Sequence, residues 1–325
     1  MIISRTPFRI SFVGGGTDLR SYYATGFGSV VSITIDKYIY ITVNKRFDSS
    51  LRIGYSKTEI VDDVEQIAHP IVRECLKLTG ITKGIEITSI ADIPAGTGLG
   101  SSSSFTVGLL NALYTYRGEQ ASSDFLARMA CHVEMDILGE PSGKQDQYAA
   151  AYGGLNFFRF NADETVQCLP LDLHNNRQEG LNKKLLLFYL GTTRSASDIL
   201  AVQNRETPDK LMFLDKMRDQ ACQLQDLLLH STKLQGLGEI LHQGWNLKRQ
   251  VNHLISNDVI EAYYDKALKA GAGGGKLLGA GGGGFLLFYC EEEKQQLVRE
   301  ALKELREVDF RISRHGSRII YLGDE

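Results

Sequence analysis

The sequence predicts an α+β fold, in which strands and helices are mixed without a regular βαβ alternation. Runs of β-branched and aromatic residues concentrate near the N-terminus, and helical spacing of apolar residues dominates 196–270. Strict alternation of strand and helix would instead indicate a parallel sheet with helices on both faces. At 325 residues the chain is long enough for two domains or for one large one.

The first half of the chain is expected to supply most of the strands. Runs dominated by β-branched and aromatic residues favour strands, and apolar residues that recur every three or four positions favour helices. The expected strands are 8–13, 29–35, 37–44 and 84–90. The expected helices are 64–78, 101–116 and 123–138.

The second half is expected to be largely helical with short strands. Gly153 and Gly154 end a helical pattern, and the polar stretch 174–184 is expected to be a loop. The expected strands are 155–160, 185–190, 276–280, 285–289, 308–312 and 318–322. The expected helices lie within 196–270 and at 294–305.

The composition excludes several classes of protein. With 43% apolar and 23% charged residues, it is that of an ordinary globular protein. A net charge of -3 gives no reason to expect a nucleic-acid or anionic-membrane partner. The 5 cysteines are scattered without a C-x-x-C pair, which argues against a disulfide framework and a zinc site. Because no signal peptide or membrane span is recognisable, we expect a cytoplasmic protein.

The most informative segment is 93–104, where alternating glycines precede four serines at the start of a predicted helix. Glycines at this spacing let successive backbone N–H groups converge on one point. The first turn of a helix adds free N–H groups and the positive end of the helix dipole, which favour an anion. Serine hydroxyls there can also reach a phosphate-bound Mg²⁺. The expected phosphate-binding residues are Gly96, Thr97, Gly98, Leu99, Gly100, Ser101, Ser102 and Ser103.

Two better-known phosphate-binding motifs do not fit this chain. A P-loop has the pattern G-x-x-x-x-G-K-[ST], but near Gly275-Lys276 the first glycine is replaced by Ala270 and the hydroxyl residue by Leu277. A dinucleotide-binding loop has the pattern G-x-G-x-x-G, but Leu19 occupies its third glycine position. The alternative to phosphate binding at 93–104 is an ordinary serine N-cap at the start of the helix.

Other candidate residues stand in distinctive surroundings. Arg9 alternates with apolar residues on a strand, so it can face a cleft while they face the core. Asp18 follows three glycines, where the backbone can approach a ligand closely and a carboxylate can accept two sugar hydroxyls. Glu134 and Asp146 lie on predicted helices, where a solvated charge or a helix-dipole partner is the alternative. A second glycine cluster at 271–285 is flanked by apolar runs, which favours an ordered turn over a linker.

These segments resemble the three signature motifs of the GHMP kinases, which include galactokinase, homoserine kinase, mevalonate kinase and phosphomevalonate kinase. The first motif has Arg9 at its basic position and ends in Thr17-Asp18, although Gly15 and Gly16 replace the usual Glu-His pair. The second matches P-x-G-x-G-L-G-S-S, and the third matches a C-terminal G-A-G-G-G-G-F. Their order and spacing agree over nearly the whole chain.

The resemblance implies an ATP-dependent phosphotransferase with an alcohol group as acceptor. It also implies two domains with the active site in the cleft between them. An N-terminal domain similar to ribosomal protein S5 would span 1–160 and carry the ATP loop and catalytic residues. A ferredoxin-like α+β domain would span 161–325.

The resemblance also assigns roles to residues of this chain. Asp146 would face the acceptor hydroxyl as a base or an orienting group, and Arg9 would stabilise charge on the transferring group. Ser102 and Glu134 would ligate Mg²⁺ beside ATP. The residues expected to bind the acceptor are Gly15, Gly16, Thr17, Asp18, Arg194, Gly282 and Gly283.

Within the superfamily the chain is most similar to bacterial D-glycero-D-manno-heptose 7-phosphate kinases. The similarity rests on 5–19, 189–197, 245–248 and 275–285. It implies phosphorylation of the anomeric C1 hydroxyl to give the 1,7-bisphosphate, for nucleotide-activated heptose and for lipopolysaccharide or capsule synthesis. The implied partners are a sugar phosphate and ATP, and a homodimer stays open. The alternatives are a fucokinase-like or galactokinase-like sugar kinase, or a non-catalytic regulator that binds sugar and ATP.

The acceptor's own phosphate needs a cationic site away from the ATP loop, because two polyanions repel at close range. Arg194 with Thr193 and Ser195 is the first candidate, since this segment precedes a helix. Lys45 and Arg46, after a strand, are the second.

Overall fold

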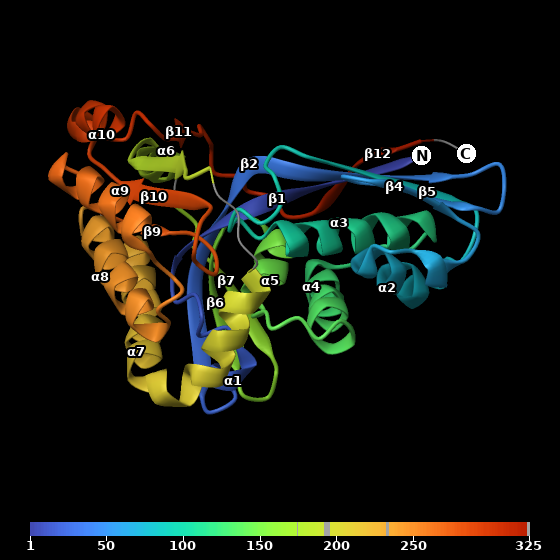
Figure 1. Cartoon of the computed structure of the whole chain (residues 1–325), viewed down its shortest axis with the longest axis horizontal. Coiled ribbons are helices and arrows are strands. Elements are labelled where there is room, and N and C mark those ends of the chain that lie inside the picture. The colour runs from blue at the N-terminus through green and yellow to red at the C-terminus, as the bar shows by residue number, and fades with distance from the viewer. Residues whose placement is uncertain (174, 192–195, 232–233, 324–325) are drawn as a thin grey trace.

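Two β-sheets with helices packed against them make up the molecule (Figure 1). The computed structural model describes residues 1–325 other than 174, 192–195, 232–233 and 324–325. The strands are β1 (Ile2–Val13), β2 (Phe27–Lys45), β3 (Leu51–Gly54), β4 (Thr58–Val61), β5 (Ile85–Ala91), β6 (Leu155–Asn161), β7 (Val166–Pro170), β8 (Leu185–Tyr189), β9 (Gly274–Leu277), β10 (Phe285–Tyr289), β11 (Arg306–Glu307) and β12 (Arg318–Leu322). The α-helices are α1 (Arg20–Tyr23), α2 (Pro70–Thr79), α3 (Ser101–Tyr116), α4 (Ser123–Cys131), α5 (Gln145–Tyr152), α6 (Asn175–Lys183), α7 (Ala196–His230), α8 (Gly236–Val251), α9 (Asp258–Lys269) and α10 (Gln295–Ala301). Shorter helical turns are η1 (Val64–Gln66), the π-helical η2 (His132–Ile137) and η3 (Glu292–Lys294).

The larger sheet runs in the order β12-β1-β2-β5-β3-β4, and β6 and β7 extend it from β2. The long strand β2 pairs antiparallel with β1, and its register shifts between Pro7 and Arg9 and between Ser11 and Val13. Its first part pairs with β6 and its second part with β5. The two strands expected at 29–35 and 37–44 are therefore one continuous strand.

Helix α3 is the central helix on the covered face of the larger sheet. Its residues from Ser103 to Tyr114 are all buried, and it packs against β1 and β2 and against the neighbouring helices α2, α4 and α5. Figure 1 shows these four helices grouped on the same side of the sheet. Because α3 is held on all sides, its N-terminus is fixed relative to β1.

The smaller sheet runs in the order β11-β8-β10-β9 and is antiparallel at each step. Helix α8 packs against β9 and β10, and α7 packs against α8. A second core cluster forms here around Trp245, Tyr264 and Phe288. The long helix α7 also contacts β1 and β2, so it links α8 to the larger sheet.

Three expected elements are wrong in the structure. The strand expected at 308–312 does not form: β11 is Arg306–Glu307, and Ile312 makes an isolated bridge with Ile35. The polar stretch 174–184 contains helix α6 rather than a loop. Leu181 is buried while most neighbouring positions of α6 are partly or fully exposed, so the helix needs little apolar surface. The helix expected at 64–78 is interrupted before Pro70, where α2 begins. Proline fits the first turn of a helix and disfavours helical backbone at the residue before it.

The expected boundary near residue 160 falls inside β6. Strands β7 and β12 also join the larger sheet, so the chain returns to its first half after completing the second. The division into two domains at that position stays a prediction. Among the residues that the structure describes, no helix is both long enough and apolar enough to cross a membrane.

Candidate active site

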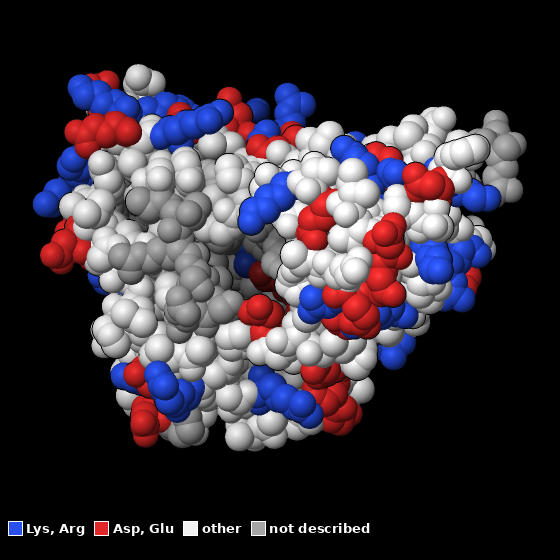
Figure 2. Space-filling view, turned by 45° about the vertical axis from the view of Figure 1, so that its right-hand side comes forward, with Lys and Arg blue, Asp and Glu red and all other residues white. Residues whose placement is uncertain are grey.

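A pocket opens where the glycine-rich segments of the two halves meet. It is lined by β1 and the turn after it, by the loop before α3, and by the start of α5. Helix α8, strand β9 and the turn after β9 line the other side. Figure 2 shows a hollow in the middle of this face, with basic and acidic atoms visible at its bottom.

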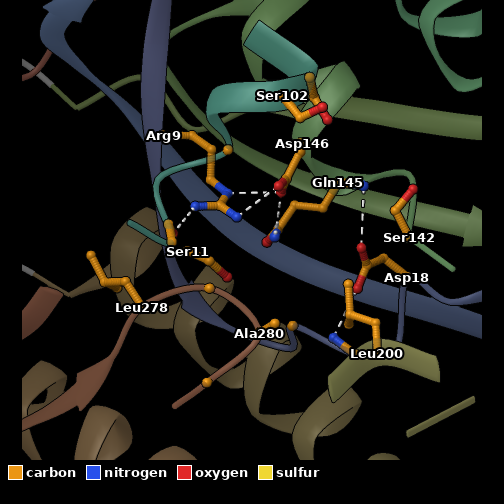
Figure 3. A pocket seen from close by; sticks show the side chains of 18 of the residues that line it. Arg9, Ser11, Asp18, Ser102, Ser142, Gln145, Asp146, Leu200, Leu278 and Ala280 are labelled. Carbon is orange, nitrogen blue, oxygen red and sulfur yellow. Dashed lines mark hydrogen bonds and ion pairs between the residues drawn. The ribbon is translucent and has the colours of Figure 1, made fainter. Parts of the chain in front are cut away.

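Arg9 and Asp146 form a bidentate ion pair in this pocket (Figure 3). Nε of Arg9 donates to Oδ1 of Asp146 at 2.8 Å, and Nη2 donates to Oδ2 at 2.7 Å. The remaining nitrogen, Nη1, donates to the carbonyl oxygen of Gly98 at 2.5 Å. Phe8 and Ile10 are fully buried in the core, so the expected alternation along β1 is confirmed. The planar guanidinium thus fixes both the carboxylate and the glycine loop.

The loop before α3 lies directly against the turn after β9. A Cβ atom on Gly98 would lie 2.4 Å from the carbonyl oxygen of Leu278, and its φ of +84° also favours glycine. Gly100 caps α3, and a Cβ atom there would lie 3.3 Å from Oδ2 of Asp146. The absence of side chains therefore lets the loop, the turn and Asp146 meet. The expected phosphate-binding residues that line the pocket are Gly96, Gly98, Gly100, Ser101, Ser102 and Ser103.

Asp18 connects the turn after β1 to the start of α5. Its Oδ1 accepts from the backbone N–H of Gly16 at 2.8 Å, and its Oδ2 accepts from the N–H of Gln145 at 3.2 Å. Burial raises the pKa of Asp18 above its usual value, although both bonds favour the ionised form. Because Gln145 precedes Asp146, the same contact helps to position the ion pair. Gly15 and Gly16 line the pocket beside Asp18, as expected.

Several polar atoms in the pocket lack a partner. Oγ of Ser11, Oγ of Ser142 and Oε1 of Gln145 are buried without a hydrogen bond among the described residues, and all three residues line the pocket. Buried polar atoms are nearly always hydrogen-bonded. These three atoms suit a ligand that carries several hydroxyl groups.

Glu134 lies behind the pocket wall rather than in its lining. Its carboxylate accepts from Oγ of Ser103 at 2.8 Å, from Oγ1 of Thr106 at 2.5 Å and from Nε2 of Gln147 at 2.6 Å. Burial raises the pKa of Glu134 to about 7. Ser103 lines the pocket, so its hydroxyl group stands between the Glu134 carboxylate and the pocket.

Two buried lysines were not recognised as site residues from the sequence. Lys248 on α8 and Lys276 on β9 both line the pocket, and each side chain comes from the second half of the chain. Trp245 precedes Lys248 by one helical turn and Leu277 follows Lys276 on a buried strand, but apolar neighbours alone do not distinguish a buried lysine from an exposed one.

Some expected site residues lie elsewhere. Thr17 uses its hydroxyl to bond the backbone of Gly14 and Ser29, and the residues Thr97, Leu99 and Gly282 are also absent from the lining, whereas Gly283 belongs to it. Arg194, Thr193 and Ser195 lie outside the described residues. Lys45 and Arg46 do not line the pocket, because β2 carries them to the far end of the sheet, where Arg46 pairs with Asp48 at 3.0 Å.

Comparison with known proteins decides the family. Residues 64–154 match the GHMP kinases N terminal domain, and residues 225–307 match the GHMP kinases C terminal family. A D-glycero-alpha-D-manno-heptose 7-phosphate kinase from Campylobacter jejuni is 30% identical over 83% of this chain and 84% of the relative. The chain belongs to the GHMP kinases. It is an ATP-dependent kinase, as the three motifs led us to expect.

Solved structures agree with this fold. A putative sugar kinase from Campylobacter jejuni superposes with a TM-score of 0.77 at 26% identity, covering 98% of this chain and 97% of that one. A D-glycero-D-manno-heptose 1-phosphate kinase from Bacteriodes thetaiotaomicron superposes over 100% of both chains with a TM-score of 0.83. At 24% identity the latter supports the fold alone. The expected α+β GHMP kinase fold is confirmed.

The pocket of this GHMP kinase fits a nucleoside triphosphate. Gly96, Gly98 and Gly100 line the pocket without side chains, so a ligand can approach the backbone of the loop. The first turn of α3 directs its free N–H groups there, where a polyphosphate is favoured. The hydroxyl of Ser102 at the pocket wall is an oxygen ligand of the kind that Mg²⁺ accepts.

Proposed function

We propose that this kinase transfers the γ-phosphoryl group of ATP to the C1 hydroxyl of D-glycero-D-manno-heptose 7-phosphate. A heptose 7-phosphate kinase from Campylobacter jejuni aligns with 83% of this chain over 84% of its own length. The observation that carries the proposal is the charge of the pocket, whose cationic lining groups Arg9, Lys248 and Lys276 outnumber its carboxylates Asp18 and Asp146. That balance suits an acceptor that is itself an anion.

Asp146 would orient the acceptor hydroxyl through Oδ2. A carboxylate has about four lone-pair sites. Oδ1 already accepts from Arg9 and from Nε2 of Gln145, at 3.2 Å, whereas Oδ2 accepts from Arg9 alone among the residues that the structure describes. Oδ2 also faces Gly100 at the start of α3. A hydroxyl bonded there would lie between the carboxylate that receives its proton and the phosphate loop.

The remaining residues would position the reactants. Asp18, Ser11, Ser142 and Gln145 would bind sugar hydroxyls, and Arg9 would stabilise charge on the transferring group. Ser102 and Glu134 would hold Mg²⁺, which neutralises phosphate charge when bound. For Glu134 this requires its bond with Ser103 to rearrange, since Ser103 stands between it and the pocket. Phosphoryl transfer depends mainly on such positioning and on charge neutralisation.

A screen of ADP release with different acceptors tests this proposal. Heptose 7-phosphate, heptose 1-phosphate, L-fucose, galactose, mannose, mevalonate and homoserine would be compared at equal concentration. We expect turnover with heptose 7-phosphate to exceed all others, and ³¹P NMR of the product to give a new signal for a phosphate on the anomeric carbon. Turnover confined to an unphosphorylated hexose would contradict the proposed substrate while leaving the kinase activity intact.

A further inference from the structure

The two lysines that line the pocket are the strongest unexplained feature of the molecule. Lys248 and Lys276 are each only 6% exposed. Nζ of Lys248 donates to the carbonyl oxygen of Gly15 at 3.1 Å, and Nζ of Lys276 donates to that of Phe12 at 3.0 Å. An ammonium group has three N–H donors, so each lysine keeps donors that no described residue uses.

Neither ammonium group has a carboxylate partner among the described residues, in contrast to Arg9, which pairs with Asp146. Burial lowers the pKa of both lysines, and for Lys276 the neighbouring charges of Lys248 and Arg9 lower it further. A buried charge without a partner is costly in a protein interior. A pair of such groups on a pocket wall indicates that the missing partner is an anionic ligand.

Strand β1 shows where this anion would lie relative to the phosphate loop. The loop contacts β1 at Arg9, whose N–H donates to the carbonyl oxygen of Leu99 at 3.1 Å. Lys276 contacts β1 at Phe12, three residues further on, which is roughly 10 Å at the rise of a strand. Lys248 contacts the following turn at Gly15. Along β1 the contact of Lys276 therefore lies between the loop and the contact of Lys248, and Lys248 contacts the turn that leads to Asp18.

The charges around each lysine agree with that order. Lys248 lies close enough to Asp18 and Asp146 to be affected by their charge. Lys276 is affected by Lys248 and Arg9 instead. The carboxylates proposed to bind the sugar thus stand beside Lys248, and Lys276 adjoins Lys248 and Arg9.

We propose that Lys248 and Lys276 form the subsite for a phosphate group already present on the acceptor. This inference rests on the proposed function, in that the acceptor is a sugar phosphate. It adds a pair of residues from the second half of the chain to the candidates expected from the sequence, of which Arg194 lies outside the described residues and Lys45 and Arg46 lie away from the pocket. The subsite sets the specificity of the kinase for phosphorylated over unphosphorylated sugars.

Methionine substitutions test the subsite, because they keep an unbranched side chain of nearly the same length and remove the charge. Lys248→Met and Lys276→Met would each be assayed with heptose 7-phosphate and with the same heptose lacking phosphate. We expect each variant to raise the KM for the 7-phosphate at least about tenfold, which corresponds to the loss of one charge-assisted hydrogen bond. The KM for ATP should stay unchanged. The kcat/KM for the unphosphorylated heptose should change by less than about threefold.

Lys184→Met is the matched control, since Lys184 pairs with Glu291 at 2.7 Å and does not line the pocket. It should leave every kinetic constant unchanged. A rise in the KM for ATP, or an equal loss with both heptoses, would overturn the subsite and assign the lysines to the nucleotide. A thermal unfolding curve for each variant would check that it folds.

The substrate and the subsite can fail separately. If the wild-type enzyme prefers another phosphorylated sugar and both methionine variants lose that preference, the proposed substrate falls and the subsite stands. If the wild-type enzyme turns over heptose 7-phosphate and the variants keep its KM, the subsite falls alone. If it uses only unphosphorylated sugars, both fall.

Discussion

Asp146→Asn separates a catalytic role of this carboxylate from a structural one. Asparagine keeps the shape of the side chain, but its amide nitrogen replaces one of the two oxygens that accept from Arg9. We expect kcat to fall at least about a hundredfold, or about 2.7 kcal/mol of transition-state stabilisation. The KM of the acceptor should change little, because Asp18 and the two lysines still line its pocket.

The same substitution weakens the fold by a smaller amount. A hydrogen bond to a charged group contributes about 1.5–3 kcal/mol to stability. Asp146 is 26% exposed while Arg9 is 5% exposed, so solvent partly screens the pair. We therefore expect the free energy of unfolding to fall by about 1–2 kcal/mol, which would lower Tm by a few degrees.

A matched pair elsewhere supplies the control. Arg299 donates to Glu307 at 2.9 Å, and Glu307 is 28% exposed and outside the pocket. Glu307→Gln should lower Tm to a similar extent and leave kcat unchanged. Steady-state ADP release at saturating ATP and acceptor gives kcat, and thermal unfolding gives Tm. If Asp146→Asn kept kcat near the wild-type value, Asp146 would be a structural residue at the start of α5.

Three further outcomes are expected. Gly98→Ala should raise the KM for ATP at least about tenfold, because a Cβ atom there meets the carbonyl of Leu278. Gly118→Ala is the control, since Gly118 has a similar positive φ but lies in open space, and it should cost only about 1–2 kcal/mol of stability. Glu134→Gln should raise the Mg²⁺ concentration for half-maximal rate about tenfold or more, and an unchanged Mg²⁺ dependence would remove Glu134 from the metal site. Burial raises the pKa of Asp18, so the folded protein keeps a proton there that the unfolded chain has already lost. That contribution to stability is complete below the unfolded pKa and disappears as pH rises through the folded pKa. As pH rises through this window, the Tm of the wild type should therefore fall relative to the Tm of Asp18→Asn. If the two curves of Tm against pH stay parallel, the raised pKa of Asp18 is contradicted.

The phosphate loop could be predicted from the sequence because its determinants are local. The positive φ angles at Gly96, Gly98 and Gly100 and the helix start at Ser101 all follow from neighbouring residues. The strand position of Arg9 is equally local, since alternation along β1 decides which side chains face the core. The pairing of Arg9 with Asp146, which are 137 residues apart, is not local. The resemblance to a family assigned both residues to one active site, but it did not predict their ion pair.

The lysines could not be found in this way because burial is a property of the folded chain. Lysine is usually exposed, and no local pattern distinguishes Lys248 from Lys269, which lies at the exposed end of α9. Helix α6 was missed for the opposite reason. Its polar composition reflects the solvent around it, so the apolar spacing that indicates a helix is weak.

The two lysines also explain why the pocket depends on both halves of the chain. Each ammonium group extends from the second half and bonds a carbonyl oxygen in β1 or the turn that follows it. These bonds join α8 and β9 to the strand that carries Arg9. Without an anion, the same groups leave positive charge buried in the pocket, which disfavours the folded state. Under the proposed function, an anionic acceptor would remove that cost when it binds, so the buried charge would strengthen binding of a phosphorylated sugar. Neutral sugars would gain nothing from this difference, and it would therefore contribute directly to specificity.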